Sequence, residues 1–121
     1  MGDFMRHNFK KLKIWQMAMD LAKDIFEITS TFPKSEEFGL KYQMNKCAVS
    51  MPSNIAEGSS RTNKSFSHFI DIALGSSFEV RQTQLLLANV KQYVSDEITI
   101  KLENKLEEFQ RATMTFQNTL N

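Results

Sequence analysis

Cysteine, proline and glycine are scarce in this chain, and long apolar runs are missing. A single cysteine, Cys47, cannot close a disulfide within the chain, and it suits a reducing compartment. Two prolines and four glycines are too few for a turn-rich β-fold or a disordered segment. No apolar run approaches the roughly 20 residues that span a bilayer, and the first residues form no apolar core of a signal peptide. We therefore expect a cytoplasmic protein with no membrane partner.

A large charge of one sign is also missing. Fifteen Lys and Arg residues against 14 Asp and Glu leave a net charge of +1, which disfavours a strongly basic nucleic-acid binder for the chain as a whole. Hydrophobic residues make up 41% of the 121 residues and charged residues 24%, as in a globular domain. This length predicts one domain over residues 1–121.

Apolar residues recur at steps of three and four along four segments, which predicts helices over about 11–32, 35–58, 63–94 and 96–120. Short breaks between them favour an all-α, antiparallel, up-down-up-down four-helix bundle. The apolar stripe of the last segment is expected at Ile98, Leu102, Leu106, Phe109, Thr113, Phe116 and Leu120.

Capping residues mark the expected helix ends. The candidate N-caps are Ser35, then Thr62 or Asn63, then Ser95 or Asp96. Pro52 falls inside the second helix, where its missing N–H and its ring predict a kink rather than a stop. Gly58 suits the left-handed position that follows a helix.

Catalytic and metal-binding patterns are not found. One cysteine and two distant histidines give no zinc spacing, paired Glu-x-x-His motifs are missing, and no glycine-rich phosphate loop occurs. We expect no metal, no cofactor and no enzymatic activity. His7 is expected in a mobile N-terminal arm, His68 on the surface, and Cys47 as a buried structural thiol.

The segment from Ser53 to Gly58 admits two interpretations. It could form a polar pocket beside the kink. An enzyme that uses Glu57 and His68 is a further hypothesis. Alternatively, Asn54 bonds the backbone exposed by Pro52, and Glu57 pairs with Arg61 four residues on. The second interpretation is favoured.

Basic residues mixed with aromatic ones suggest a second kind of site. They could bind nucleic-acid phosphates and stack bases, or they could simply be a solvated helix start with Phe9 and Trp15 packed on the bundle. Identical chains in a ring would multiply each small basic spot. The candidate nucleic-acid-binding residues are Arg6, Lys10, Lys11, Lys13, Arg61 and Lys64.

The first expected helix carries apolar residues on nearly every side, which is typical of a helix buried on two sides. In a small monomer one of those sides would be exposed. Our first hypothesis is therefore a self-assembling interaction module with copies of itself, and with another protein, as partners. Nucleic-acid binding, to RNA or DNA, is the alternative.

Residues 9–21 read F-x-x-L-x-x-W-x-x-A-x-x-L, residues 32–40 hold Phe-Pro and then Phe-Gly-Leu, and residues 48–58 end in Pro-Ser-Asn-Ile-Ala-Glu-Gly. These three strings resemble the opening, the first turn and the most diagnostic segment of the 23S ribosomal RNA intervening-sequence protein family. The third helix adds Phe66-x-x-Phe69 and the string at residues 72–76. The family motif residues, which we expect to be structural, are Trp15, Pro52, Ser53, Asn54, Glu57 and Gly58.

The resemblance implies a four-helix bundle, often assembled as a homopentameric ring, whose biochemical role is largely unassigned. It also implies a relation to the accessory variability determinants of diversity-generating retroelements, which bind nucleic acid. One departure stands out: Val80 to Leu85 holds one residue more than the family pattern, with a basic residue, Arg81, where an acid is usual. An extra residue inside a helix is often absorbed as a π-bulge, which would explain the broken apolar phase there.

Overall fold

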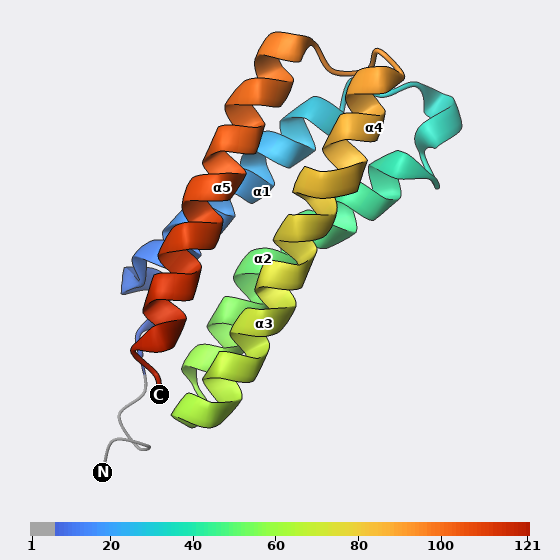
Figure 1. Ribbon diagram of the computed structural model, residues 1–121. Coiled ribbons are helices and arrows are strands. Elements are labelled where there is room, and N and C mark those ends of the chain that lie inside the picture. The colour runs from blue at the N-terminus through green and yellow to red at the C-terminus, as the bar shows by residue number, and fades with distance from the viewer. Residues whose placement is uncertain (1–6) are drawn as a thin grey trace.

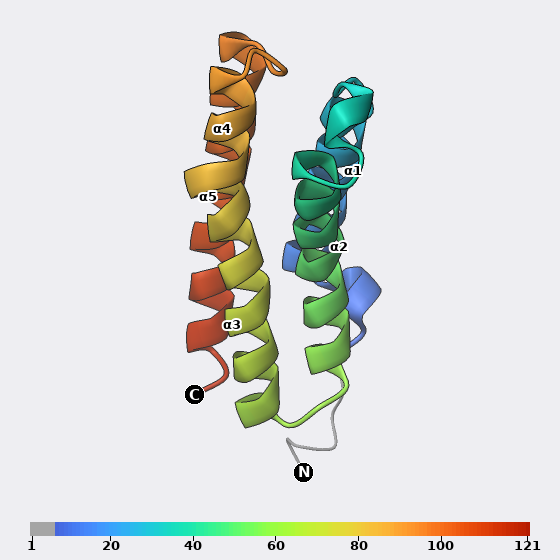
Figure 2. The ribbon, with the colours of Figure 1, turned by 90° about the vertical axis from the view of Figure 1, so that its right-hand side faces the viewer.

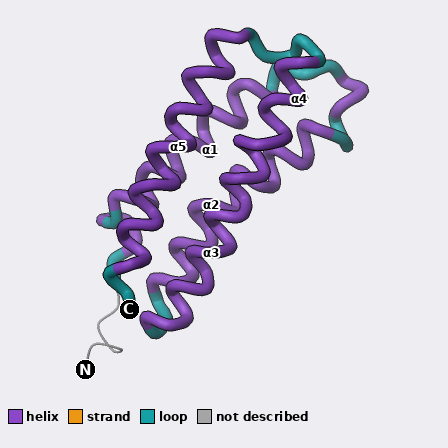
Figure 3. The backbone as a smooth tube through the Cα atoms, in the orientation of Figure 1, coloured by secondary structure: helices purple, strands orange, loops and turns teal. Residues whose placement is uncertain are grey.

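The computed structural model describes residues 7–121, and all regular structure within that range is helical (Figure 3). The longer helices are α1 (Lys13–Thr29), α2 (Leu40–Ser59), α3 (Asn63–Glu79), α4 (Leu85–Val90) and α5 (Asp96–Asn118). Two short 3-10 turns, η2 (Phe9–Lys11) and η3 (Lys34–Glu36), precede α1 and α2, and a π-turn, η4 (Val80–Gln84), joins α3 to α4. The all-α fold class is thereby confirmed.

Helices α3, η4 and α4 follow one another as one continuous helix, so the long helices make up four rods. The four rods pack side by side (Figure 1). The chain turns back in each of the three connections between rods (Figures 1 and 2). Helix α2 packs between α1 and α3, and α5 contacts both α1 and α3. No helix in residues 7–121 combines the length and the apolar character needed to cross a bilayer.

The core is built from the apolar stripes of all four rods. Phe66 and Phe109 are its largest fully buried side chains, and Ile14, Leu21 and Ile25 supply the stripe of α1. Burying one such side chain contributes roughly 1.5–3 kcal/mol relative to leaving it exposed. This core therefore explains why the four segments with helical periodicity pack together.

The predicted stripe of α5 is wrong at one position. Leu102, Leu106 and Phe109 are buried as expected, but Ile98 is 46% exposed and Thr99 is buried in its place. Ile98 faces a groove between α1 and α5 instead of the core. The period alone does not show that residues of α1 and α5 leave a cavity beside this position.

Two of the predicted helix starts are confirmed. The side chain of Thr62 accepts a hydrogen bond from the Ser65 amide at 3.3 Å, and the Ser95 side chain accepts one from the Ile98 amide at 3.2 Å. Ser35 does not cap the second helix, which begins at Leu40. The carboxylate of Glu36 instead accepts from the Leu40 amide at 3.1 Å.

Three of the four rods are also shorter at their C-terminal ends than predicted. Helix α1 ends at Thr29 and not at Phe32, although Phe32 remains buried. The third rod ends at Val90 because Gln92 turns the chain with φ of 66°. Helix α2 runs through Pro52 to Ser59, and the bend expected at Pro52 stays a prediction.

The predicted irregularity in the third rod is confirmed. Residues 80–84 form one turn of π-helix, in the segment where an extra residue was expected. One residue corresponds to about 100° of rotation in an α-helix, so the turn changes which side chains of α4 face inward. Leu85 and Ala88 are buried, whereas Leu86, Leu87 and Val90 are exposed.

Candidate functional site

The N-terminal segment is anchored at the end of the bundle where α2 finishes. The amide of His7 donates a hydrogen bond to the Ser59 carbonyl at 3.2 Å. The His7 ring contacts Phe66 and Phe116 edge-on, with ring centroids 5.3 and 5.8 Å apart. The expectation that His7 lies in a mobile arm is therefore wrong, because two aromatic rings and a backbone bond hold it.

The turn that follows His7 is fixed by its own capping residue. Asn8 caps η2 by accepting from the Lys10 amide at 3.2 Å, and Gln16 of α1 donates to the Lys10 carbonyl at 2.9 Å. The Phe9 ring meets Trp15 edge-on at 5.2 Å. Trp15 is thus half-buried, packing on the core on one side and on Phe9 on the other.

Five of the six predicted basic residues lie in two segments that meet at this end. Lys10, Lys11 and Lys13 are exposed beside η2, and the His7–Ser59 hydrogen bond ties that segment to the turn that carries Arg61 and Lys64. None of these lysines forms an ion pair within residues 7–121, so their charges are available to a partner. The sixth, Arg6, lies outside the described residues.

Arg61 is less available than the lysines. Its Nη2 lies 2.5 Å from Oε2 of Glu57, its Nε donates to the same oxygen at 3.0 Å, and its guanidinium lies 5.4 Å from the centre of the Phe69 ring. The predicted i,i+4 pair is confirmed. Glu57 neutralises Arg61, while Phe69 orients it.

Asn54, Pro52 and Ser53 of the expected motif lie on α2. Asn54 donates from Nδ2 to the carbonyl and to the hydroxyl of Ser50, both at 2.9 Å. It therefore bonds backbone of its own helix, but it bonds Ser50 and not the Ala48 carbonyl that Pro52 leaves unpaired. Pro52 is buried and Ser53 is exposed.

Gly58 does not hold the left-handed position expected of it. The described chain has no glycine with positive φ, and Gly58 lies inside α2. A Cβ atom there would lie 2.7 Å from Cδ1 of Phe66 and 2.9 Å from Cβ of Phe69. Glycine is thus required because α3 crosses α2 at this point.

Cys47 is a buried, protonated thiol, as predicted. Its Sγ donates to Oε2 of Glu79 at 2.9 Å and accepts from Nε2 of Gln84 at 3.5 Å. Burial, with Glu79 as the second cause, raises the pKa of the Cys47 thiol to about 11. Such a thiol is a poor nucleophile at neutral pH.

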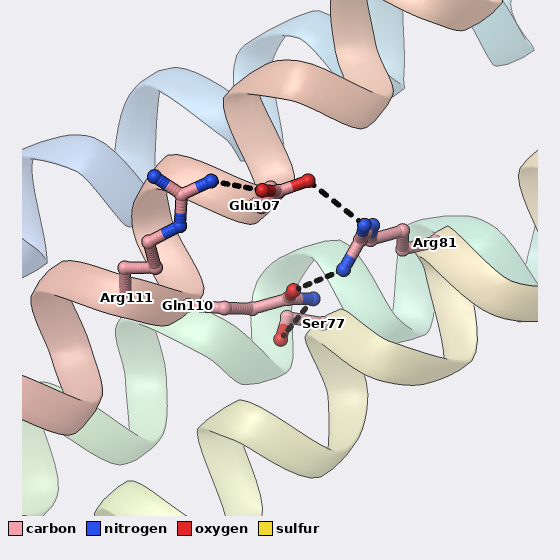
Figure 4. Close-up of polar contacts among 5 residues, drawn as sticks. All are labelled: Ser77, Arg81, Glu107, Gln110 and Arg111. Carbon is pink, nitrogen blue, oxygen red and sulfur yellow. Dashed lines mark hydrogen bonds and ion pairs between the residues drawn. The ribbon is translucent and has the colours of Figure 1, made fainter.

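The π-turn positions a polar network that sequence reasoning did not find (Figure 4). Arg81 donates from Nη2 to Glu107 at 2.9 Å and from Nη1 to Gln110 at 3.0 Å, and Arg111 also pairs with Glu107. Hydrogen bonding and charge from Arg111, with the charge of Arg81, hold the pKa of Glu107 below its usual range. Gln110 then donates to the buried Ser77 at 3.2 Å. The only signal in the sequence was the broken apolar phase before Leu85.

A catalytic constellation is not formed by the residues that could have supplied one. His68 is exposed beside Phe69, as predicted, and Glu57 is engaged by Arg61. Within residues 7–121, no three His, Cys, Asp or Glu side chains lie close enough together to hold a metal ion.

Comparison with known proteins gives a family for this geometry. No curated protein matches the chain. Residues 10–115 match the family described as 23S rRNA-intervening sequence protein, and this range runs from η2 to the last turns of α5. Because the match covers most of the chain, the protein belongs to the 23S rRNA-intervening sequence protein family.

Proposed function

We propose that this chain is a non-enzymatic module that assembles with copies of itself and presents the assembled surface to other macromolecules. One observation carries the proposal: large apolar side chains are exposed on α4 and α5 and in the turn before α2. The exposed fraction is 91% for Phe38, 76% for Val90 and 58% for Ile100. Scattered exposed apolar residues are common, whereas neighbouring ones on a single helix are typical of protein–protein contacts.

The exposed apolar surface is distributed differently from our expectation. On α1 only Met19 and Phe26 are exposed, at 45% and 46%, because Trp15 and Met17 pack partly against the core. Larger exposures lie in the η3 connection and on α2, α4 and α5. Self-association is therefore favoured by several surfaces and not by α1 alone.

The non-enzymatic part of the proposal is supported by the state of the reactive groups. Cys47 is protonated and buried, and Glu57 is paired with an arginine. The cavities of about 250 and 290 Å³ between α1 and α5 are lined by neither Glu57 nor His68. The hypothesis of an enzyme built on those two residues has no supporting contact.

The mass of the protein in solution tests the proposal. Light scattering across a range of concentrations should give a multiple of the 14.0 kDa chain mass, and family resemblance predicts five chains. A species of one chain at every concentration would refute self-assembly. Hydrolytic or transfer activity towards a broad substrate panel would refute the non-enzymatic part.

Nucleic-acid binding is the second candidate function, favoured by the His7–Ser59 hydrogen bond. That bond brings Lys10, Lys11 and Lys13 to the turn of Arg61 and Lys64. An oligomer would repeat this basic cluster and add avidity. Likeness to the accessory variability determinants points the same way, and that relation stays a prediction.

A matched pair of triple variants separates this function from general charge attraction. Replacing Lys10, Lys11 and Lys13 by alanine should abolish salt-sensitive binding to labelled structured RNA or duplex DNA. Replacing the exposed Lys23, Lys34 and Lys46 changes the net charge equally and should leave most of the binding. Equal losses from both variants would contradict a localised site.

A further inference from the structure

We propose that copies of this chain join head to tail, with an apolar ridge on α4 of one copy seated in a groove between α1 and α5 of the next. The ridge consists of Leu86, Leu87 and Val90, and is called the α4 ridge. The groove, called the α1–α5 groove, has Ile28 and Ile98 at its centre. This inference rests on the proposed self-assembly and names the two surfaces that carry it.

The α4 ridge is a continuous apolar surface. Val90 lies three and four residues after Leu87 and Leu86, and side chains at those spacings are neighbours on a helix. Their exposed fractions are 40% for Leu86, 46% for Leu87 and 76% for Val90. The π-turn is the cause, because its extra residue turns Leu85 towards the core and leaves these three outside.

The α1–α5 groove is made of two adjoining cavities with volumes of about 250 and 290 Å³. Glu27, Ile28 and Ile98 line both cavities, so the two form one continuous depression. Leu102 extends the apolar lining at one end, and Val94 extends it at the other. Ile98 occupies a position where the helical period expects a core residue, yet it stays 46% exposed.

The shape of the groove favours an apolar helix face over a small molecule. The depression runs along two helices, and side chains at i, i+3 and i+4 of a third helix commonly fill such a groove. The α4 ridge offers that spacing.

The charges at the rim of the groove agree with this occupant. Lys105 bridges Asp20 and Asp24 within the chain, whereas Lys101 lines the same cavity and forms no ion pair among residues 7–121. Glu27 likewise has no ion-pair partner within that range, and it lines both cavities. Lys91 directly follows Val90, is exposed, and pairs with Glu36 of its own chain at 3.6 Å. A seated ridge would offer Lys91 a second acid, Glu27.

The ridge and the groove lie in different parts of the molecule, which decides the symmetry of the contact. Figure 2 shows α4 and α1 on different sides of the bundle. Every copy therefore offers one ridge and one groove, and the contact is heterologous. Repeated contacts of this kind close into a ring or continue as a filament, according to the rotation between copies.

Complementation between two variants tests this symmetry. Val90→Asp disables the ridge and Ile98→Asp disables the groove, and each variant alone should run as a single chain in light scattering. An equal mixture should form a two-chain species and nothing larger, because one intact ridge meets one intact groove. Ile72→Asp, a matched change at an exposed isoleucine of α3, should assemble like the unaltered protein.

The outcomes separate this inference from the proposed self-assembly. An unaltered chain that never assembles overturns both. An unaltered chain that assembles while either aspartate variant still assembles overturns the ridge-and-groove contact alone, as does an equal mixture that stays single-chain. Circular dichroism should show unchanged helix content in each variant. If Val90→Asp unfolds, Leu87→Asp replaces it as the ridge variant; if Ile98→Asp unfolds, Lys101→Glu replaces it as the groove variant.

Discussion

Arg81 and Gln110 are joined by a hydrogen bond of 3.0 Å that connects the surface of the bundle to its interior. Gln110 is only 2% exposed, and its amide nitrogen donates onward to the hydroxyl of Ser77. A partly exposed guanidinium therefore satisfies a buried carboxamide (Figure 4). The π-turn is fastened to α5 through this contact.

Replacing Arg81 by methionine should lower the free energy of unfolding by about 1–3 kcal/mol, because the buried oxygen of Gln110 loses its donor. Chemical denaturation of both proteins measures the difference. Gln82→Met alters the exposed neighbour in the same π-turn and should change stability by less than about 0.5 kcal/mol. Equal effects of the two substitutions would contradict a specific role for Arg81.

Alanine at Gly58 should destabilise the fold by about 1–3 kcal/mol, because its methyl group would overlap two side chains of α3. The same substitution at Gly75, which has no atom within 4 Å of the added Cβ, should stabilise α3 by roughly 0.5–1 kcal/mol. Thermal or chemical denaturation of the pair gives opposite signs if the helix crossing is the cause. Two gains of similar size would show that helix propensity, and not the close approach of α3, dominates.

Cys47 should react slowly with iodoacetamide at neutral pH in the folded protein and rapidly in denaturant. Burial holds the pKa of the thiol at about 11, against 9.0 for an unperturbed thiol, so very little thiolate forms near pH 7. The labelling rate is followed by mass spectrometry. Fast labelling of the native protein at pH 7 would place Cys47 in a different environment.

The same pKa shift predicts a loss of stability at alkaline pH. Between pH 9 and 11 the folded chain keeps the thiol proton that the unfolded chain releases, so the free energy of unfolding falls as the pH rises through this window. Cys47→Ala removes the titrating group. The difference in stability between the two proteins should therefore vary over pH 9–11 and stay constant below it.

Glu36 should contribute to stability at neutral pH and lose that contribution in acid. Hydrogen bonds from the Leu40 amide and the Tyr93 hydroxyl, with the charge of Lys91, hold the pKa of Glu36 below its ordinary 4.5. The benefit is complete above pH 4.5 and disappears as the pH falls through the lowered value. The melting temperatures of the natural protein and Glu36→Gln should converge as the pH falls from 6 to 3. A constant difference would show that the charge of Glu36 is irrelevant.

Local chemistry made much of the fold predictable. Thr62 and Ser95 cap their helices because a short hydroxyl side chain before an apolar period reaches the free amides of the first turn. The apolar residues of the third rod lose their helical spacing before Leu85, and this break indicated the π-turn. An extra residue inside a helix can be absorbed as a π-turn, which keeps the apolar faces on both sides of it packed. Each of these signals lies within a few residues of the feature it predicts.

Features that depend on contacts between distant segments were missed. Ser35 has a good capping side chain, yet Glu36 accepts the hydrogen bond from the Leu40 amide. Glu36 is also held by the Tyr93 hydroxyl, from the connection between α4 and α5. The role of Gly58 is set by Phe66 and Phe69, which no local pattern connects to it. For the candidate nucleic-acid site, composition supplied the lysines and the antiparallel topology placed both basic segments at one end, but the hydrogen bond from His7 to Ser59 that ties them together was missed.

The π-turn also changes how this surface could evolve. Deleting one codon within residues 80–84 would restore an ordinary helix and rotate α4 by about 100° relative to α3. Leu86, Leu87 and Val90 would keep their identities but face another direction. Two chains that differ only by that codon would thus present incompatible surfaces. A genome that encodes both could keep their assemblies separate without changing any side chain of α4.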